Sequence, residues 1–208
     1  MGVAPETLDC SVSGRVPIYI SRDDRYFQDK YQAIPQKGYT AMVEKMLTNK
    51  LITVKLNTDF ADIKDDIEYE RLFFSGSIDE FFGYELGILP YRSLRIVFDK
   101  YKKTYFQSGP QINYPQDYDF TRSVEYKYYL DEKSDETIVS HEYPCAFVVD
   151  KNERFYPIPF STNHALYNQY KEKAQKLQNV WFLGRLGDYK YYNMDQTVQR
   201  ALDLFKEV

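Results

Sequence analysis

Apolar and polar residues recur with different periods along the chain, and each change of period marks an expected element. Apolar residues over 42–47 have helical spacing, which predicts a helix capped at its start by Thr40. Alternation over 52–56 predicts a half-buried strand, and the apolar run Leu72–Phe74 predicts a buried strand. Small residues follow that run, so we expect the strand to end in a ligand-facing loop.

The middle of the chain, from about 91 to 159, shows no helical period. β-branched and aromatic residues dominate Ser93–Phe98, Ser123–Leu130 and Thr137–Tyr143. Extended segments separated by polar turns are typical of an antiparallel sheet. We interpret the charged stretch over 131–136 as a solvated hairpin tip between two of these strands.

Helical spacing returns near the end of the chain. It predicts a helix near 162–178, a strand over 180–183, a turn over 184–187 and a final helix. The final helix has one apolar face, made by Met194, Val198, Ala201, Leu202 and Phe205. Together with the central strands, these elements predict a mixed α+β fold.

The turn over 184–187 and the helix after it form the most informative local pattern. Asn193 and Gln196 have the spacing of a capping box, which fixes the start of that helix. Free backbone N–H groups and the positive end of the helix dipole make such a start attractive to an anion. Arg185, flanked by glycines, can approach a diphosphate closely. A purely structural turn and cap explains the same residues equally well.

Composition narrows the class of protein. At 208 residues the chain is long enough for one large domain, or for one and a half, with an ample core. Its 27 basic and 31 acidic residues give a net charge of −4, so we expect no nucleic acid partner. Its apolar runs are far shorter than the roughly 20 residues that span a bilayer, so we expect a soluble protein without membrane insertion. Two cysteines, Cys10 and Cys145, and no export or lipidation signal favour a cytoplasmic location.

Aromatic residues are the unusual part of the composition, with 21 tyrosines and 14 phenylalanines. A Tyr-rich sheet whose hydroxyls reach water explains them. A polar cleft that uses phenols as donors and ring faces as platforms is the alternative.

Local motifs for common enzyme chemistry are missing. The stretch His141–Cys145 contains the residue types of a zinc site, but Pro144 prevents the helix that such a site needs, so no metal is predicted. Glu142 is then either a carboxylate in a cleft or a solvated, salt-bridged one. The chain contains no glycine-rich dinucleotide motif, no phosphate loop and no signature of Ser-His-Asp catalysis.

Short motifs follow one another in a fixed order along nearly the whole chain. They are Arg15-Val16-Pro17, Arg25-Tyr26-Phe27, Pro35 with Gly38-Tyr39-Thr40, Phe74-Ser75-Gly76 with Asp79, Gly83-Tyr84 through Tyr91-Arg92, Asn113-Tyr114, Thr121-Arg122, Glu142-Tyr143, Tyr156-Pro157-Ile158 and Gly184-Arg185-Leu186-Gly187 through Tyr191 and Met194-Asp195. In this order they resemble the UDP-galactopyranose mutase family, flavoproteins that interconvert the pyranose and furanose forms of UDP-galactose.

The resemblance implies roles for individual residues. Arg15 would lie on a mobile loop that closes over substrate, Arg122 would grip the diphosphate, and Glu142 would be the carboxylate near the active site. The substrate-binding set would be Arg15, Tyr26, Arg92, Asn113, Arg122, Tyr156 and Tyr191. The cofactor-binding set would be Gly184, Arg185, Tyr191, Asn193, Met194 and Asp195. Asn193 departs from the Asp expected there, which keeps the cap and removes a charge near the flavin.

The resemblance also implies the chemistry. The N5 atom of reduced FAD attacks the sugar's anomeric carbon, UDP leaves, and a ring-opened flavin–sugar adduct recloses as the five-membered ring before UDP returns. UDP-galactose is the implied substrate, and its product serves galactofuranose supply for cell-surface polysaccharide. The protein would contribute positioning and charge stabilisation, which arginines and tyrosines suit.

The family's glycine-rich, dinucleotide-binding half has no counterpart in this chain, and Met1 falls near the Trp of the family's sugar site. We therefore expect an N-terminal segment with the substrate loop (1–34), elements packing on the flavin-binding domain (35–90), an antiparallel substrate domain (91–160) and the end of the flavin-binding domain (161–208). The missing half, or a second chain that supplies it, is an expected partner, a homo-oligomer is possible, and the chain alone should be inactive. A non-catalytic module that binds a nucleotide sugar or glycan, or a structural remnant, is the alternative.

Overall fold

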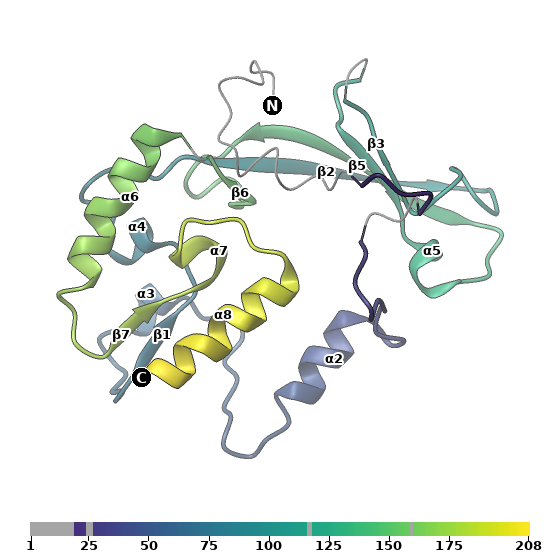
Figure 1. The fold of residues 1–208 in the computed structure, drawn as a ribbon. Coiled ribbons are helices and arrows are strands. Elements are labelled where there is room, and N and C mark those ends of the chain that lie inside the picture. Colours follow the sequence, from purple (N-terminus) through teal and green to yellow (C-terminus); the bar gives the residue numbers. More distant parts are fainter. Residues whose placement is uncertain (1–18, 24–26, 116–117, 159) are drawn as a thin grey trace. The chain divides into compact units, whose positions relative to one another are not determined.

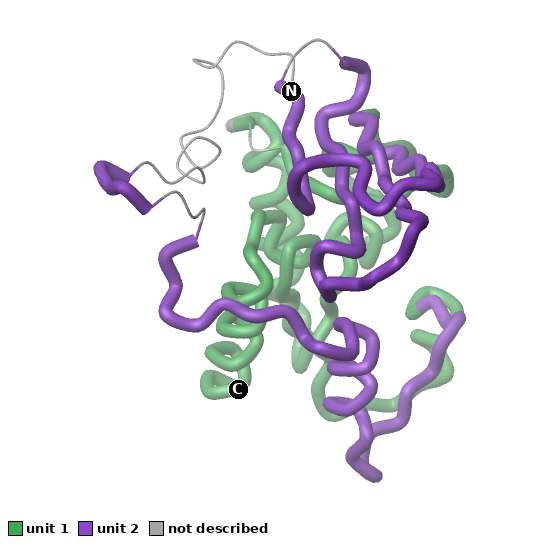
Figure 2. Tube along the Cα trace, turned by 90° about the vertical axis from the view of Figure 1, so that its right-hand side faces the viewer, with its two compact units in different colours: residues 1–16, 60–94, 145–208 green, residues 17–59, 95–144 purple. Residues whose placement is uncertain are grey.

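The computed structural model describes residues 19–23, 27–115, 118–158 and 160–208. The described chain divides into two compact units (Figure 2). Of the described residues, unit 1 contains 60–94 and 145–208, and unit 2 contains 95–144 and those between 19 and 59. The expected four-segment division of the chain stays a prediction.

Unit 1 combines two long helices, α6 and α8, with shorter helices and strands (Figure 1). Its elements are α3 (Phe60–Ile63), β1 (Leu72–Phe74), α4 (Ile78–Phe81), the start of β2 (Tyr91–Tyr101), β6 (Tyr156–Pro157), α6 (Ser161–Ala174), β7 (Val180–Phe182), α7 (Gly184–Gly187) and α8 (Met194–Glu207). Unit 2 holds α2 (Gly38–Met46), most of β2, β3 (Gln111–Asn113), β4 (Arg122–Glu125), α5 (Lys127–Leu130) and most of β5 (Thr137–Ala146).

The strands form two sheets. The larger has the strand order β3-β4-β5-β2-β6, and its β3–β4, β4–β5 and β2–β6 pairs are antiparallel. The smaller is the parallel pair β1–β7, in which Leu72 lies opposite Val180 and Phe74 opposite Phe182. The fold is therefore mixed α+β with an antiparallel sheet, as the sequence predicts.

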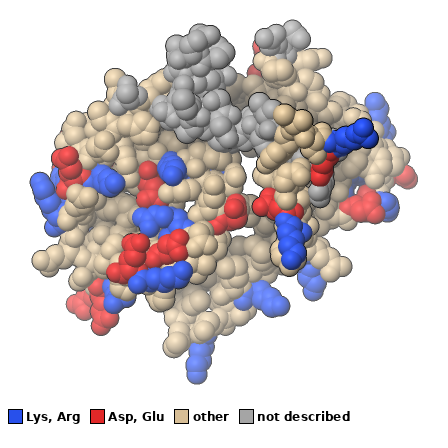
Figure 3. Space-filling model, in the orientation of Figure 1, with Lys and Arg blue, Asp and Glu red and all other residues tan. Residues whose placement is uncertain are grey.

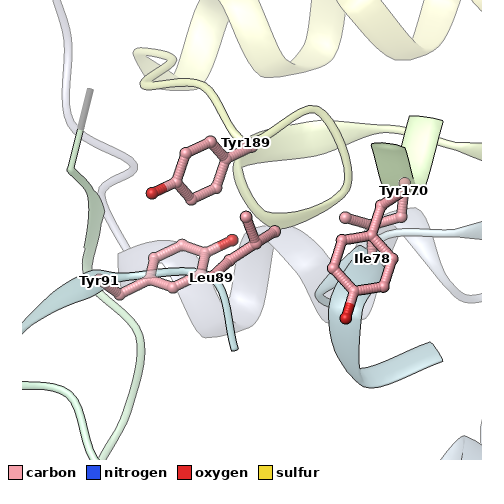
Figure 4. Packing of buried hydrophobic residues seen from close by; sticks show 5 residues of the cluster. All are labelled: Ile78, Leu89, Tyr91, Tyr170 and Tyr189. Carbon is pink, nitrogen blue, oxygen red and sulfur yellow. The ribbon is translucent and has the colours of Figure 1, made fainter. Parts of the chain in front are cut away.

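The core of unit 1 is made largely of tyrosines. Five buried residues cluster there, Ile78, Leu89, Tyr91, Tyr170 and Tyr189 (Figure 4). The phenol of Tyr170 donates to the Gly87 carbonyl at 2.7 Å and accepts from the Leu86 N–H at 3.0 Å. Burial raises the pKa of Tyr189 to about 12, and its hydroxyl donates to the Pro90 carbonyl at 2.6 Å. The buried hydroxyls of Tyr170 and Tyr189 thus both have hydrogen-bond partners, as burial of a polar group requires.

A buried carboxylate fixes the start of β2. Asp79 is fully buried, and one of its oxygens accepts the Leu89 N–H at 2.8 Å. The other oxygen accepts a short hydrogen bond from the Ser77 hydroxyl. These bonds hold α4 against the segment that leads to Tyr91 and Arg92, so they position a predicted site residue.

A second buried carboxylate organises unit 2. Glu125 ends β4 and accepts the Phe106 N–H at 3.0 Å, the Gln107 N–H at 3.0 Å and the Thr137 hydroxyl at 2.6 Å. Lys127, also buried, donates to the carbonyls of Thr104 at 2.6 Å and Ser134 at 2.7 Å. The network ties the loop after β2 to β4 and β5, which carry Arg122 and Glu142.

Several local predictions need correction. Helix α2 begins at Gly38 after Lys37, so Thr40 is inside it and is not its cap. Residues 52–56 are exposed and form no strand in the described chain. The predicted strand over 123–130 ends at Glu125, and the rest of that segment forms α5. The turn over 184–187 is the short helix α7.

Basic and acidic side chains are interspersed over the face shown in Figure 3. In unit 1, Arg154 lies 3.1 Å from Glu80, and Arg200 lies 3.1 Å from Asp188. Among the described residues, no helix has the length and apolar character needed to cross a membrane.

Candidate functional site

Three predicted site residues form a row across unit 2. Asn113 on β3 lies opposite Arg122 on β4, which lies opposite Glu142 on β5. The Nε of Arg122 donates to the Asn113 Oδ1 at 3.2 Å, and its Nη1 lies 3.4 Å from the Glu142 Oε2. Directly opposed positions of antiparallel strands share one face of the sheet, so pairing alone brings these side chains together.

The row remains accessible to solvent. The Arg122 side chain is 34% exposed and the Glu142 side chain 14% exposed. The charges of Arg122 and Glu142 both affect the pKa of Tyr129 on α5. Burial raises this pKa, and the Tyr126 and Glu142 side chains raise it further. The charge of Arg122 lowers it. A partly exposed guanidinium held at a fixed position is suited to bind an anion in two-point contact.

A second group of predicted residues lies in unit 1. Arg92 on β2 is opposite Tyr156 on β6, and the Tyr156 ring stacks on the Tyr191 ring with centroids 5.9 Å apart. The guanidinium carbon of Arg185 lies 4.3 Å from the centroid of the Tyr191 ring. The result is a continuous group of two arginines and two phenols, all partly exposed.

Local structure explains the position of Arg185. Gly184 begins α7 with a φ of +83°, a conformation that glycine adopts without strain. The Nε of Arg185 donates to the Tyr192 carbonyl at 2.7 Å, which leaves its terminal amino groups without a hydrogen bond to any described residue. Gln196 accepts the Asn193 N–H at 2.9 Å, and the predicted capping box at the start of α8 is confirmed. Met194 and Asp195 are exposed in the first turn of that helix.

Within each unit, the structure brings several predicted residues together. Unit 2 holds Asn113, Arg122 and Glu142, and unit 1 holds Arg92, Tyr156, Arg185 and Tyr191, with Gly184, Asn193, Met194 and Asp195 near Arg185 in the chain. Arg15 and Tyr26 lie outside the described residues.

Sequence reasoning missed Tyr129 and Arg154. The Nη2 of Arg154 donates to the Tyr84 hydroxyl at 2.8 Å, its Nη1 lies 3.1 Å from Glu80, and its guanidinium carbon lies 4.4 Å from the Phe147 ring centroid. These contacts fasten the segment that leads to Tyr156. The contacts with Tyr84 and Glu80 join residues distant in sequence, so no local motif could have indicated them.

The arrangement defines a class of protein. It is a mixed α+β protein with a two-stranded parallel sheet and an antiparallel sheet that presents an arginine between polar partners. Comparison with known sequences adds the family. The model of the UDP-galactopyranose mutase family matches residues 1–191. This chain belongs to that family, as the order of its motifs predicts.

Curated relatives agree with this assignment. UDP-galactopyranose mutase of Mycoplasma genitalium is 37% identical over 208 residues, covering 90% of this chain and 50% of the relative. UDP-galactopyranose mutase of Mycoplasma pneumoniae is 36% identical, covering 97% of this chain and 54% of the relative. dTDP-fucopyranose mutase of Escherichia coli is 32% identical, with 97% and 55% covered. The chain spans about half the length of the curated relatives it matches.

Proposed function

We propose that this chain is a portion of a UDP-galactopyranose mutase that interconverts UDP-galactopyranose and UDP-galactofuranose. Family membership supports the reaction class, an isomerisation of a nucleotide sugar. The row Asn113–Arg122–Glu142 is the observation that carries the proposal, because it offers an oriented, partly exposed guanidinium to the diphosphate. Arg15 and Arg122 stabilise the charge of UDP as it departs, and Glu142 is the carboxylate near the reacting sugar.

The phenols and amides of the proposed site orient the substrate. Tyr26, Tyr156 and Tyr191 donate hydrogen bonds to it, and Arg92 and Asn113 add polar contacts. The stacking of Tyr156 on Tyr191 supports a shared role, because each ring restricts the rotamer of the other. Because these side chains are already held in place, less conformational entropy is lost when the substrate binds.

Unit 1 offers groups that fit one part of FAD. The terminal amino groups of Arg185 suit a pyrophosphate, and the exposed first turn of α8, with Asn193, Met194 and Asp195, suits a hydrogen-bonding ring edge. Tyr191 contacts one residue of each proposed set. Its ring stacks on Tyr156 of the substrate set and lies against the guanidinium of Arg185 of the cofactor set. Reduced FAD, when bound, supplies the nucleophile for the anomeric carbon.

An isomerisation assay tests the proposal. The chain is joined to the unmatched half of the M. genitalium relative, reduced with dithionite, and supplied with UDP-galactofuranose, while chromatography follows UDP-galactopyranose. We expect isomerisation that Arg122→Ala reduces at least a hundredfold, because the departing diphosphate loses its main cation. Arg95→Ala, an exposed arginine of the same unit, should leave the rate within twofold.

Two results would redirect the proposal. Binding of UDP-galactose without isomerisation by a folded, flavin-loaded fusion favours the alternative, a non-catalytic nucleotide-sugar or glycan-binding module. Faster isomerisation of dTDP-fucose than of UDP-galactose would retain the reaction class and change the substrate, as the name of the E. coli relative suggests.

A further inference from the structure

Tyr189 occupies a backbone position that usually carries glycine. After α7 the Lys190 N–H donates to the Arg185 carbonyl at 3.1 Å, and the Tyr189 N–H donates to the Leu186 carbonyl at 3.4 Å. These two bonds form the Schellman pattern of a helix end, whose left-handed residue is most often glycine. Tyr189 has a φ of +46° there, which is unfavourable for a bulky side chain. Such strain persists only where neighbouring contacts hold the residue in place.

The side chain of Tyr189 makes those contacts in the core of unit 1. It is 2% exposed, and its ring packs edge-on against Tyr91 with centroids 5.2 Å apart (Figure 4). Its hydroxyl donates to the Pro90 carbonyl at 2.6 Å and, in a longer bond, to the Ile158 carbonyl at 3.2 Å. Because burial raises the pKa of this phenol to about 12, the hydroxyl keeps its proton and remains a donor at neutral pH.

The two carbonyls belong to a pair of residues that proline leaves without a full set of hydrogen bonds. Pro90 and Ile158 extend the antiparallel register of β2 with β6 by one position, and the Ile158 N–H donates to the Pro90 carbonyl at 3.2 Å. In a regular antiparallel pair the second residue returns this bond, but proline has no N–H. The Ile158 carbonyl instead accepts from two side chains, the hydroxyl of Tyr189 and the amide of Asn163 at 2.8 Å.

Each of the three residues joined by this hydroxyl lies two positions from a predicted site residue. The pairs are Tyr189 with Tyr191, Pro90 with Arg92, and Ile158 with Tyr156. Side chains two residues apart on an extended segment point to the same side, so a shift of β2 or β6 moves its site residue as well. The Tyr156 and Tyr191 rings also stack on each other, so displacement of one disturbs the other.

We propose that Tyr189 is a positioning residue for the isomerisation, whose hydroxyl holds the segments that carry Arg92, Tyr156 and Tyr191 in one arrangement. Packing alone would be served by phenylalanine, and the turn alone by glycine, so the buried phenol meets a separate requirement. Tyr189 acts through the three site residues and does not itself contact the substrate. The inference rests on the proposed function, which assigns those residues to a UDP-sugar site.

Tyr170 offers a matched control for removal of the hydroxyl. It is a fully buried tyrosine of the same core, and its hydroxyl also makes two backbone hydrogen bonds, with Gly87 and Leu86. Neither of these partners adjoins a predicted site residue. Tyr189→Phe and Tyr170→Phe each remove one oxygen atom, so both should lower stability toward urea to a similar extent. Only Tyr189→Phe should change the site.

Nuclear magnetic resonance tests the arrangement without any ligand. The 208-residue chain is isotope-labelled in its tyrosine rings, and the signals of Tyr156 and Tyr191 are assigned from their phenylalanine variants. We expect both ring signals to shift in Tyr189→Phe and to stay in place in Tyr170→Phe.

Kinetics test the consequence for the reaction. In the fusion with the unmatched half of the M. genitalium relative, Tyr189→Phe should lower kcat for UDP-galactofuranose about tenfold or more, with KM changed less than about threefold. Displaced groups lose more of their contact with the transition state than of ground-state binding. Tyr170→Phe should leave both constants within about twofold. In a Tyr156→Phe background the loss caused by Tyr189→Phe should shrink, because one of the positioned hydroxyls is already absent.

Each remaining outcome bears on the proposal. It is wrong if neither ring signal shifts in Tyr189→Phe, if Tyr170→Phe acts equally on the signals or on kcat, or if the losses of Tyr189→Phe and Tyr156→Phe multiply. It is also wrong if the signals shift while kcat is unchanged. Should circular dichroism show Tyr189→Phe to be unfolded, Tyr189→His replaces it, because its shorter ring cannot reach both carbonyls, and the same shifts and loss are expected. Shifted signals together with a parent fusion that does not isomerise the sugar would support the positioning and contradict the proposed function.

Discussion

The guanidinium of Arg122 lies 3.4 Å from the carboxylate of Glu142, at directly opposed positions of two antiparallel strands. Both side chains are partly exposed, and exposed ion pairs contribute only about 0–1 kcal/mol to stability. The pair therefore does little to hold the sheet together. The ion pair instead affects ligand binding, because Glu142 competes with any anion that approaches Arg122.

Removal of the Arg122 side chain should weaken ligand binding far more than it weakens the fold. We expect Arg122→Ala to reduce the affinity of the fused enzyme for UDP by about 1.5–3 kcal/mol, since charge-assisted bonds to the diphosphate are lost. Calorimetric titration with UDP measures this, and Arg95→Ala provides the control. Equal affinity in parent and Arg122→Ala would remove Arg122 from the site.

Replacement of Glu142 should have the opposite effect on binding. Glu142→Gln keeps the shape of the side chain and removes the negative charge beside Arg122, so we expect UDP to bind about 0.5–1 kcal/mol more tightly. The same titration at low salt measures the gain, which should shrink as salt is added. Weaker binding of UDP would instead mean that Glu142 orients Arg122 for the ligand.

Glu125 should make stability depend on pH. Its burial raises the pKa, but hydrogen bonds from Thr137, Gln107 and Phe106 and the charge of Lys127 outweigh that effect and leave the pKa below its usual value. A lowered folded-state pKa contributes stability above the unfolded-state pKa, and that contribution is lost as the pH falls through the folded-state value. Glu125→Gln should therefore cost about 1–3 kcal/mol at pH 7 and progressively less below about pH 4.

Urea unfolding of parent and Glu125→Gln across this pH range measures the effect. Glu132→Gln, an exposed carboxylate in the nearby loop, should change stability by less than about 0.5 kcal/mol. A difference between parent and Glu125→Gln that grows on acidification would contradict the assigned cause.

Gly187 should tolerate no side chain. A Cβ there would lie 3.3 Å from the Phe182 carbonyl carbon and 3.3 Å from the Phe74 carbonyl oxygen, both backbone atoms of the parallel pair. We expect Gly187→Ala to destabilise unit 1 by about 1–3 kcal/mol, because α7 must move away from β1 and β7. Gly109→Ala, where a Cβ meets open space, is the control in thermal unfolding. Equal melting temperatures for the two variants would show that α7 is not packed as described.

The strands of the antiparallel sheet could be predicted because their signal is local. β-branched and aromatic residues cluster within β2 and β5, and their composition alone indicates extended structure. The partnership of Arg122 with Glu142 could not be predicted from pattern, because it depends on the register between β4 and β5. Only the family resemblance indicated that both residues belong to one site.

Periodicity identifies which residues share a face and says nothing of what covers that face. The apolar residues of α8 share one face of the helix, as predicted, yet they are exposed in the described chain. They are Met194, Val198, Leu202 and Phe205. The alternation over 52–56 predicted a strand, but a strand needs a neighbour to supply hydrogen bonds, and the described residues supply none there. Tertiary context, rather than local propensity, decides both cases.

The isolated chain should not retain FAD. Arg185 and the first turn of α8 offer contacts to a pyrophosphate and a ring edge, but the sequence contains no glycine-rich strand–helix turn for the rest of the cofactor. A flavin bound at one edge keeps most of its surface in water, while binding must offset roughly 4–15 kcal/mol of lost translational and rotational freedom.

Gel filtration with absorbance detection measures flavin retention. We expect no visible flavin band to travel with the 208-residue chain, and a band of about one flavin per chain to appear once the unmatched half of a relative is joined to it. Arg185→Ala should weaken retention in the fusion, because it removes the guanidinium that we propose contacts the pyrophosphate. A yellow isolated chain that also isomerises UDP-galactofuranose under reducing conditions would show that these residues alone complete the flavin site, and that the catalytic unit is smaller than family membership implies.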